Sequence, residues 1–525
     1  MKKLALLFLS LALPLFAAFS LDPVFSSNMV LQQNAPIAFF GQATPGAAVT
    51  VDFAGATLAT IADFQGGWRV VFPAREASHD VLSVTISSEG EKIELANILI
   101  GDVWLCSGQS NMEMPIAKAF KRGWSAQNCE EEVANANYPE IRYADQKNRL
   151  SYLKPRQDAT YAFGDGWVVC TPDIAHKFSA TAYFFIRKIY LDLKIPCGLI
   201  NATWSGTRIQ PWISQEGYEN ANLQKELDDI AAKTITATTV AQRTAEYTKA
   251  VEEYKKKLAE LPEDEKKNLK EPARLRLPPS DAQFFSNLYN GMVAPWTKLP
   301  IKGVIWYQGC SNAGDKRYYL LHKAMIADWR QKWNSPALPF ILVQLASFGG
   351  PENWQDIPTA DAPYAVIRDM QARLISDPNV GIACAIDIGE RTNIHPANKQ
   401  EVGRRLALEA ERIAYGMDIV SRGPMLDKIQ VEGKTVRVFY KYAYNGLKTT
   451  DGDAPHAFAI AGEDGKFVKA DAKIDGNTVV VSAPEIDNPV FVRYAYAAFR
   501  GDCNLENTEG LAAYPFRSDV VDYEK

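Results

Sequence analysis

The stretch Gly101-Asp102-Val103-Trp104-Leu105-Cys106-Ser107-Gly108-Gln109-Ser110-Asn111-Met112 marks the start of a strand–turn–helix pattern. Its apolar run fits a buried strand, and Ser110 follows small residues at a point where a helix can begin. In an open α/β sheet the carboxyl ends of the strands form the ligand crevice. A serine there offers a nucleophilic hydroxyl and a backbone N–H directed at an oxyanion. Serine is also a common helix N-cap, so the pattern alone leaves both roles open.

The same alternation of buried strands and helices continues along the chain. Apolar runs occur at residues 197–200, 303–307, 340–345 and 380–388, and helical segments at 180–193, 318–333, 362–374 and 399–415. Buried strands that alternate with helices indicate a parallel sheet covered on both faces. We therefore expect a three-layer α/β core over residues 99–417.

Strand-like sequence lies on both sides of this core. Val49, Val51 and Phe53 alternate with polar residues in the region 21–98, and similar alternation recurs in the region 418–525. Alternation with frequent Gly and Pro turns predicts an N-terminal and a C-terminal β-sandwich domain. Within the core, residues of about 216–280 are rich in Ala, Glu and Lys. They predict a helical insertion with a solvated charged face, and a partner-binding arm is the alternative.

The first twenty residues have the layout of a secretory signal peptide. Lys2 and Lys3 precede an apolar stretch at 4–16, and Ala18-Phe19-Ser20 fits a cleavage site. The stretch is short for a membrane span, which needs about 20 residues, although a retained anchor is the alternative. No later segment is apolar enough to span. We expect a secreted or periplasmic protein with no membrane contact after signal removal.

The charge balance and the cysteine and histidine patterns argue against nucleic acid and structural zinc as ligands. The 525 residues include 57 Lys+Arg and 62 Asp+Glu, so no basic excess favours nucleic acid as a partner. The seven cysteines form no CxxC pair and the five histidines no HExxH motif, which argues against a structural zinc site. Seven is an odd number, so at least one thiol must stay free. No metal is predicted.

Three further sites follow predicted strands. Asn312 could donate to an oxyanion, or it could satisfy turn backbone. His395, on a loop after the run at 380–388, could act as general base, although a lone histidine is more often structural. Gly206 would let a backbone N–H approach an oxyanion, or simply form a tight turn. The other histidines have no nucleophile-like neighbour in the sequence: His79, His176, His322 and His456.

These motifs, in this order, resemble those of the sialate O-acetylesterase family of SGNH-type hydrolases. The resemblance runs over nearly the whole chain after residue 20. Its most specific blocks are Gly-Gln-Ser-Asn-Met and Trp-Tyr-Gln-Gly. The matching segments are 29–33, 106–112, 205–207, 211–212, 288–292, 306–312, 394–396, 398–399, 492–494 and 514–517.

The resemblance implies a flavodoxin-like SGNH core and a serine esterase that needs no cofactor or metal. By position, Ser110 would be the nucleophile and His395 the general base. The Ser110 and Gly206 backbone N–H groups and the Asn312 side chain would form the oxyanion hole. The implied substrate is an O-acetylated sugar or glycan, with sialic acid the implied sugar. The sequence does not indicate an oligomeric state.

Two positions depart from the family pattern. Asn393 stands where an Asp two residues before the histidine is usual, and Cys310 stands where a Glu is usual. Both changes remove a carboxylate from the expected site, and the orienting Asp of a triad is worth about four decades in rate. Three replacements stay open: Glu390 or Asp387 on the same loop, a backbone carbonyl that orients a Ser–His dyad, or Asn393 hydrogen-bonded to the imidazole. Cys310 is the thiol most expected to be free.

Two alternatives to a sialate esterase stay open. One is a deacetylase for a polysaccharide such as acetylxylan, because substrate specificity depends on loops whose geometry the sequence does not give. The other is a catalytically impaired, carbohydrate-binding relative, because of the two missing carboxylates.

Overall fold

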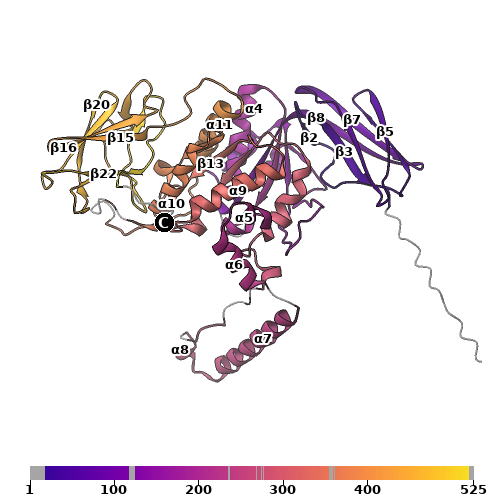
Figure 1. Ribbon diagram of the computed structural model, residues 1–525, viewed down its shortest axis with the longest axis horizontal. Helices are drawn as coiled ribbons and strands as arrows, with labels where there is room; N and C mark the ends of the chain where they lie inside the picture. The colour runs from indigo at the N-terminus through magenta and orange to yellow at the C-terminus, as the bar shows by residue number, and fades with distance from the viewer. Residues whose placement is uncertain are drawn as a thin grey trace, which may run out of the picture.

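The structure is a computed structural model that describes residues 18–117, 124–234, 237–267, 269–272, 275, 277–353, 359 and 361–519. The predicted signal peptide at 1–20 therefore falls almost entirely outside the described residues. An α/β part lies between two β-rich parts, one at each end of the molecule (Figure 1). The described part of the chain holds no helix that is both long and apolar enough to cross a membrane.

The central sheet is parallel apart from one edge strand, with the order β10-β9-β11-β8-β12-β13-β14. Without β9 and β10, which lie outside β11, the order is the 2-1-3-4-5 of flavodoxin-like sheets. Every residue of β11, β12, β13 and β14 is buried, as expected for strands covered on both faces. The strands are β8 (Glu91–Gly108), β9 (Tyr138–Asp145), β10 (Val168–Cys170), β11 (Cys197–Thr203), β12 (Gly303–Tyr307), β13 (Phe340–Gln344) and β14 (Val380–Cys384).

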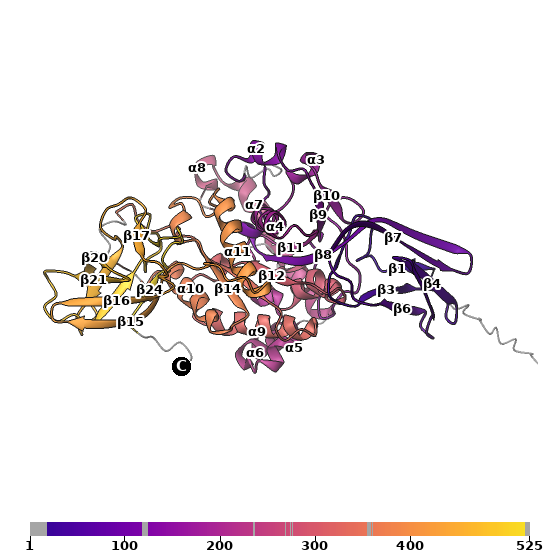
Figure 2. The same ribbon diagram turned by 90° about the horizontal axis from the view of Figure 1, so that it is seen from above.

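Helices cover both faces of this sheet (Figure 2). On one side α4 (Ala180–Leu193) packs along α11 (Lys399–Ala414), and on the other lie α9 (Tyr318–Lys332) and α10 (Pro363–Ala372). These bounds agree with the predicted helices to within two residues. The strand expected at 380–388 is shorter than predicted, because the chain turns into a short helix at Ile386–Ile388. Other short helices include α1 (Ser110–Glu113), α2 (Cys129–Ala134) and α3 (Pro172–Ala175), with helical turns at Gln210–Trp212, Pro278–Ser280, Tyr289–Val293, Ala294–Lys298, Cys310–Asn312 and Arg373–Ser376.

The N-terminal β-rich part is joined to the central sheet by one continuous strand. The first half of β8 pairs with β7, and its second half pairs with β11 and β12. The predicted boundary between residues 98 and 99 therefore lies inside a strand. A separate sheet, β1-β3-β6, packs face to face on the strands β4, β5 and β7. The ring centre of Phe53 on β4 lies 5.2 Å from that of Phe39 and 5.4 Å from that of Phe72. The strands are β1 (Ser20–Leu21), β2 (Val30–Gln32), β3 (Ile37–Gln42), β4 (Ala48–Phe53), β5 (Ala56–Ile61), β6 (Gly67–Phe72) and β7 (Ser78–Ser88).

The C-terminal part has two four-stranded sheets, β15-β16-β21-β20 and β19-β18-β22-β24, and the pair β17-β23. Tyr440 of β16 and Phe516 of β24 pack between the two larger sheets with ring centres 6.2 Å apart. The strands are β15 (Met425–Glu432), β16 (Thr435–Lys441), β17 (Leu447–Thr449), β18 (Phe458–Ala461), β19 (Val468–Lys469), β20 (Asp471–Asp475), β21 (Thr478–Ser482), β22 (Phe491–Tyr494), β23 (Leu505–Asn507) and β24 (Phe516–Arg517).

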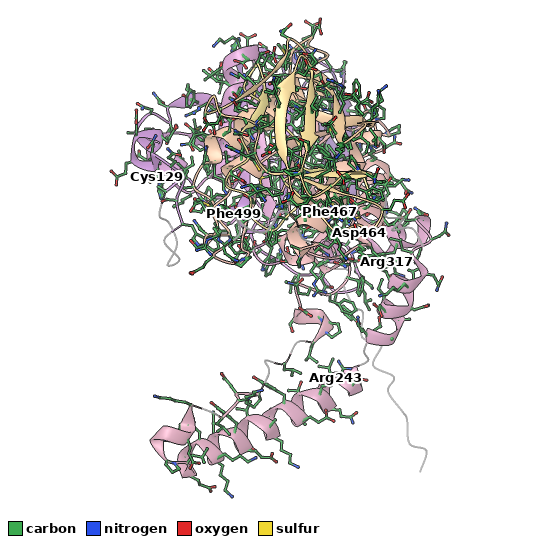
Figure 3. The ribbon with its side chains drawn as sticks, turned by 90° about the vertical axis from the view of Figure 1, so that its left-hand side faces the viewer. Cys129, Arg243, Arg317, Asp464, Phe467 and Phe499 are labelled. Carbon is green, nitrogen blue, oxygen red and sulfur yellow. The ribbon has the colours of Figure 1, made fainter. Side chains whose placement is uncertain are left out.

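The helical insertion begins against the core and then leaves it. Its first helices are α5 (Gln215–Asn220) and α6 (Gln224–Lys233), and α6 is tied to the start of α9 by the Glu226–Arg317 ion pair. Beyond them α7 (Ala237–Glu260) and α8 (Glu263–Lys266) stand away from the body. Figure 3 shows Arg243 on α7 well clear of the body that carries Arg317.

A buried ionic cluster anchors the start of the C-terminal part to α11. The Glu409 carboxylate is fully buried and accepts hydrogen bonds from Arg422 Nε at 2.8 Å and Ser421 Oγ at 2.6 Å. Arg422 also donates to the Val380 carbonyl of β14. The cluster therefore ties together α11, β14 and the chain that leaves the core.

We expect Glu409→Ala to lower the free energy of unfolding by about 3–5 kcal/mol, because it leaves the buried Arg422 charge uncompensated. Urea denaturation measures this change. The control is Asp487→Ala, which removes an ion pair whose side chains are 71% and 74% exposed and should leave the midpoint unchanged. Equal shifts in the two variants would contradict the anchoring role.

A second expected effect concerns Asp145, the last residue of β9, which accepts a hydrogen bond from Asn201 Nδ2 at 2.6 Å. Burial raises the pKa of its carboxyl from 3.8 to about 7. The folded protein thus holds a proton that the unfolded chain releases above about pH 4, so stability falls as pH rises toward 7. Between pH 5 and 8 the free energy of unfolding should therefore fall by about 2–4 kcal/mol less in Asp145→Asn than in the wild type. Denaturation curves at several pH values test this, and an unchanged slope would refute it.

Candidate active site

The predicted site residues converge on the carboxyl edge of the central sheet. β8 lies between β11 and β12, so the turns that follow these three strands are neighbours. The chain leaves β8 toward β9 on one side, whereas it leaves β12 toward β13 on the other. This reversal is the point at which open α/β sheets bind ligands.

A glycine makes the sharp turn from β8 into α1 possible. Gly108 has a φ of +136°, and a Cβ there would lie 2.3 Å from the Tyr307 carbonyl oxygen. The Gln109 N–H donates to the same carbonyl at 3.0 Å, and the Gln109 Oε1 accepts from the Gly309 N–H at 3.1 Å. The turn is therefore fixed against β12, with Ser110 as the first residue of α1.

Ser110 and His395 lie within hydrogen-bond distance, although 285 residues separate them in the sequence. His395 Nε2 is 2.8 Å from Ser110 Oγ. Ser110 is buried and His395 half-buried, and the Trp124 ring lies against the imidazole with ring centres 3.8 Å apart. This is the geometry that a general base needs to take a proton from a serine hydroxyl.

The two other predicted oxyanion donors lie on the neighbouring turns. Gly206 follows β11 with a φ of +72°, and the Ser205 N–H donates to Glu113 of α1 at 2.5 Å. Asn312 follows β12 and accepts from the Ile209 N–H at 2.9 Å, which joins its turn to that of Gly206.

The Asn312 amide group is already engaged in this structure. Its Nδ2 donates to Gln210 Oε1 at 3.1 Å and to Asp315 Oδ2 at 3.2 Å. A substrate oxyanion would therefore have to replace one of these acceptors. Among the three predicted donors, Asn312 thus differs from the two backbone groups in needing a change of partner.

The three candidate orienting groups for His395 have well-defined partners of their own. Asn393 Oδ1 accepts from the His395 backbone N–H at 3.0 Å, and Asn393 Nδ2 donates to Glu390 Oε2 at 3.1 Å. Glu390 also accepts from the Ala397 N–H, and Asp387 forms a two-bond ion pair with Arg405. Asn393 and Glu390 therefore shape the loop backbone around the histidine, and Asp387 is committed to α11.

Cys310, at the position where the family resemblance leads us to expect a glutamate, lies near a buried lysine. Burial raises the pKa of the Cys310 thiol, and all seven cysteines are free thiols, as expected for Cys310. Lys399 is fully buried, and burial lowers the pKa of its ammonium group to about 7. Lys399 Nζ donates to Asn111 Oδ1 at 2.6 Å and to the Pro396 carbonyl at 2.8 Å.

Four polar or aromatic neighbours of the site were not assigned roles from the sequence. Lysine is rarely fully buried, so no pattern indicates that the first residue of α11 faces inward. For Asn111 alone the sequence offers a signal, because it directly follows the predicted nucleophile Ser110. The four residues are Asn111, Glu113, Trp124 and Lys399.

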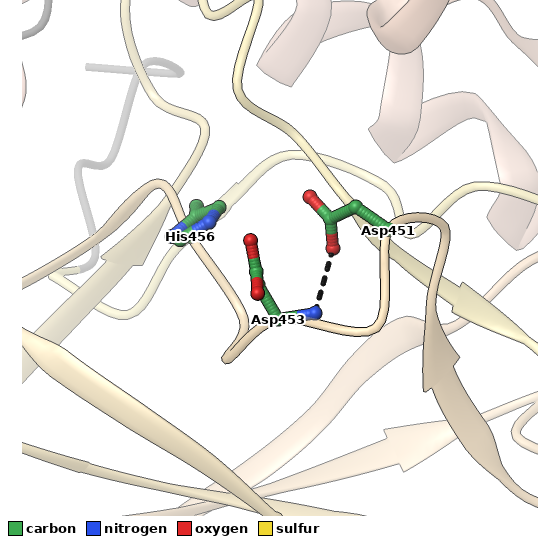
Figure 4. Close-up of side chains that lie close together, drawn as sticks. All are labelled: Asp451, Asp453 and His456. Carbon is green, nitrogen blue, oxygen red and sulfur yellow. Dashed lines mark hydrogen bonds between the residues drawn. The ribbon is translucent and has the colours of Figure 1, made fainter.

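A group of possible metal ligands lies far from this site, in the C-terminal part. One ligand atom each of Asp451, Asp453 and His456 lies within 4.8 Å of the others (Figure 4). The Asp453 N–H donates to Asp451 Oδ1 at 3.1 Å, and Asn504 Nδ2 donates to the same carboxylate. Both carboxylates are exposed and held by local loop contacts, and we assign the group no role.

Comparison with known proteins identifies a family for this arrangement. A family model described as carbohydrate esterase, sialic acid-specific acetylesterase, matches residues 279–412, which include Asn312 and His395. Sialate O-acetylesterase from Mus musculus is 29% identical over 446 residues, which cover 77% of this chain and 75% of that protein. The Homo sapiens sialate O-acetylesterase is 28% identical, with coverage of 77% and 73%.

A solved structure extends the likeness to the whole chain. A carbohydrate acetylesterase from Xanthomonas citri is 30% identical, with a TM-score of 0.78, and the match covers 96% of this chain and all of that one. The chain is an ester hydrolase that belongs to the sialate O-acetylesterase family of carbohydrate esterases.

Proposed function

We propose that this chain is an exported carbohydrate O-acetylesterase that works through a Ser110–His395 acyl-enzyme mechanism. The observation that carries the proposal is the 2.8 Å contact between Ser110 Oγ and His395 Nε2 at the carboxyl edge of the sheet. Family membership supports the reaction class, because the relatives are carbohydrate esterases. The layout of residues 1–20 supports export.

The positions of these groups support the following mechanism. Ser110 Oγ attacks the acetyl carbonyl carbon while His395 Nε2 takes the hydroxyl proton. The oxyanion accepts hydrogen bonds from the Ser110 and Gly206 N–H groups and from Asn312. When the ester C–O bond breaks, the imidazolium protonates the departing sugar oxygen. Water then attacks the acyl-enzyme with His395 as base, and acetate leaves with Ser110 restored.

The proposed architecture is an SGNH-type core, 99–417, between β-sandwich domains at 21–98 and 418–525. The flavodoxin-like strand order supports the core assignment. Aromatic packing between facing sheets in the two outer parts supports the sandwiches. The boundary at 98/99 marks a change in sequence pattern. It is not a flexible linker, because β8 continues through it.

We expect Ser110→Ala to lower kcat/KM for acetate release from 4-nitrophenyl acetate by roughly 10³-fold or more, and His395→Ala to do nearly the same. The double variant should be little worse than either single one, because the two groups act as a unit. The control is Ser107→Ala on the same strand, whose hydroxyl donates to the Ala202 carbonyl. Equal rates for wild type and Ser110→Ala would sink the mechanism and favour the catalytically impaired, glycan-binding alternative.

The proposed substrate is an O-acetylated sialic acid, because the mouse and human relatives are sialate O-acetylesterases. Acetate release should therefore show a higher kcat/KM on O-acetylated sialic acids than on acetylated xylan. The Xanthomonas citri relative is a carbohydrate acetylesterase without a named sugar, and so fits either class. A preference for xylan would instead identify a polysaccharide deacetylase.

A further inference from the structure

The loop that carries His395 is held on both sides of the histidine by two buried side chains. Asn111 Nδ2 donates to the carbonyl of Ile394 at 2.9 Å. Lys399 Nζ donates to the carbonyl of Pro396 at 2.8 Å and to Asn111 Oδ1 at 2.6 Å. The three hydrogen bonds form a continuous bridge that spans the histidine, from the residue before it to the residue after it.

The bridge starts at the serine. Asn111 is the residue after Ser110 in α1, and its backbone carbonyl accepts from Thr181 Oγ1 of α4 at 3.0 Å. Ser179, the N-cap of α4, donates to the next carbonyl of α1, that of Met112, at 2.5 Å. The α1 end of the bridge is thereby fixed to α4. The bridge therefore joins the serine turn to the histidine loop through buried hydrogen bonds.

Burial makes this arrangement costly unless every polar atom is satisfied. Asn111 is 2% exposed and Lys399 is 0% exposed. A buried ammonium group is expensive even when it is hydrogen-bonded. The acceptors of Lys399 are an amide oxygen and a backbone carbonyl, both of which belong to the bridge. Two of the Lys399 N–H donors thus have acceptors in the bridge, and buried hydrogen bonds of this kind restrict the geometry of the groups that they join.

We propose that Asn111 and Lys399 are positioning residues that hold His395 opposite Ser110. Neither side chain bonds to the imidazole in the contacts above; both act on the backbone that carries it. The loop has other supports, from Asn393 and Glu390 within it and from the Gln127 N–H to the Ala397 carbonyl. Those contacts shape the loop, whereas the bridge connects it to the nucleophile turn. The inference rests on the proposed Ser110–His395 mechanism.

The expected signature of lost positioning is a fall in kcat with little change in KM. A misplacement of about 1 Å at reacting atoms can cost roughly 10²-fold in rate. Lys399→Met and Asn111→Leu keep the side-chain volume approximately and remove the hydrogen bonds. Each should lower kcat by about 10²-fold, and the double variant should cost less than the product of the two, because both belong to one network.

The matched control is Gln400→Ala, in the same first turn of α11. Its side-chain amide nitrogen has two acceptors outside the bridge: Gln400 Nε2 donates to the Gln127 carbonyl at 2.6 Å and to Glu132 Oε1 at 3.4 Å. This variant should keep the wild-type kcat. A wild-type kcat in folded Lys399→Met, or an equal loss in Gln400→Ala, would overturn the proposal.

A readout independent of turnover separates this proposal from the proposed function. The ¹⁵N resonance of His395 Nε2 reports its contact with the serine hydroxyl. It should shift in Ser110→Ala, Lys399→Met and Asn111→Leu but not in Gln400→Ala. If the wild type released no more acetate than Ser110→Ala, the proposed mechanism would be wrong. The His395 Nε2 resonance would still show whether Asn111 and Lys399 position the histidine. If Lys399→Met did not fold, Asn111→Leu would supply both measurements, and an unshifted resonance there would overturn the bridge.

Discussion

The close approach of β8 and β12 is the constraint on which the active site depends. Because the backbone of Gly108 lies against the Tyr307 carbonyl, no side chain can separate the two strands at their carboxyl ends. The turn after β8 must therefore leave the sheet sharply, and Ser110 is placed at the first residue of a helix. Gln109 then binds the β12 turn rather than solvent. One glycine thus sets the position of the serine and of the neighbouring Asn312 turn.

The site is made from short polar side chains that bind backbone, and ion pairs play little part in it. Glu113 holds the Ser205 turn, Asn312 holds the Ile209 N–H, and Asn111 holds the loop of His395. Each bond joins turns that follow different strands. Where such groups are buried these bonds fix geometry well, because leaving either partner unsatisfied is expensive. This design is consistent with a histidine whose loop lacks the aspartate usual in the family.

Much of this organisation could be predicted because it is written in local patterns. The alternation of apolar runs and amphipathic segments predicted α4, α9 and α11 to within two residues, since helix periodicity depends on burial of one face. The pairing of Ser110 with His395 was expected from their positions after predicted strands and from the family resemblance, and the two side chains lie 2.8 Å apart. The continuity of β8 and the burial of Lys399 could not be predicted. Both depend on which chain segments pack around them, and an exposed lysine at a helix start has the same sequence pattern.

The uninterrupted passage of β8 through two packed regions has a mechanical consequence. A strand hydrogen-bonded along both halves is a poor hinge, so β8 couples the N-terminal sheets to the central sheet without a flexible linker. By contrast, α7 and α8 stand away from the body and are tethered through α6. Changes in chain length at α7 should therefore cost little energy, whereas a single residue inserted into β8 would reverse the facing of its side chains beyond that point.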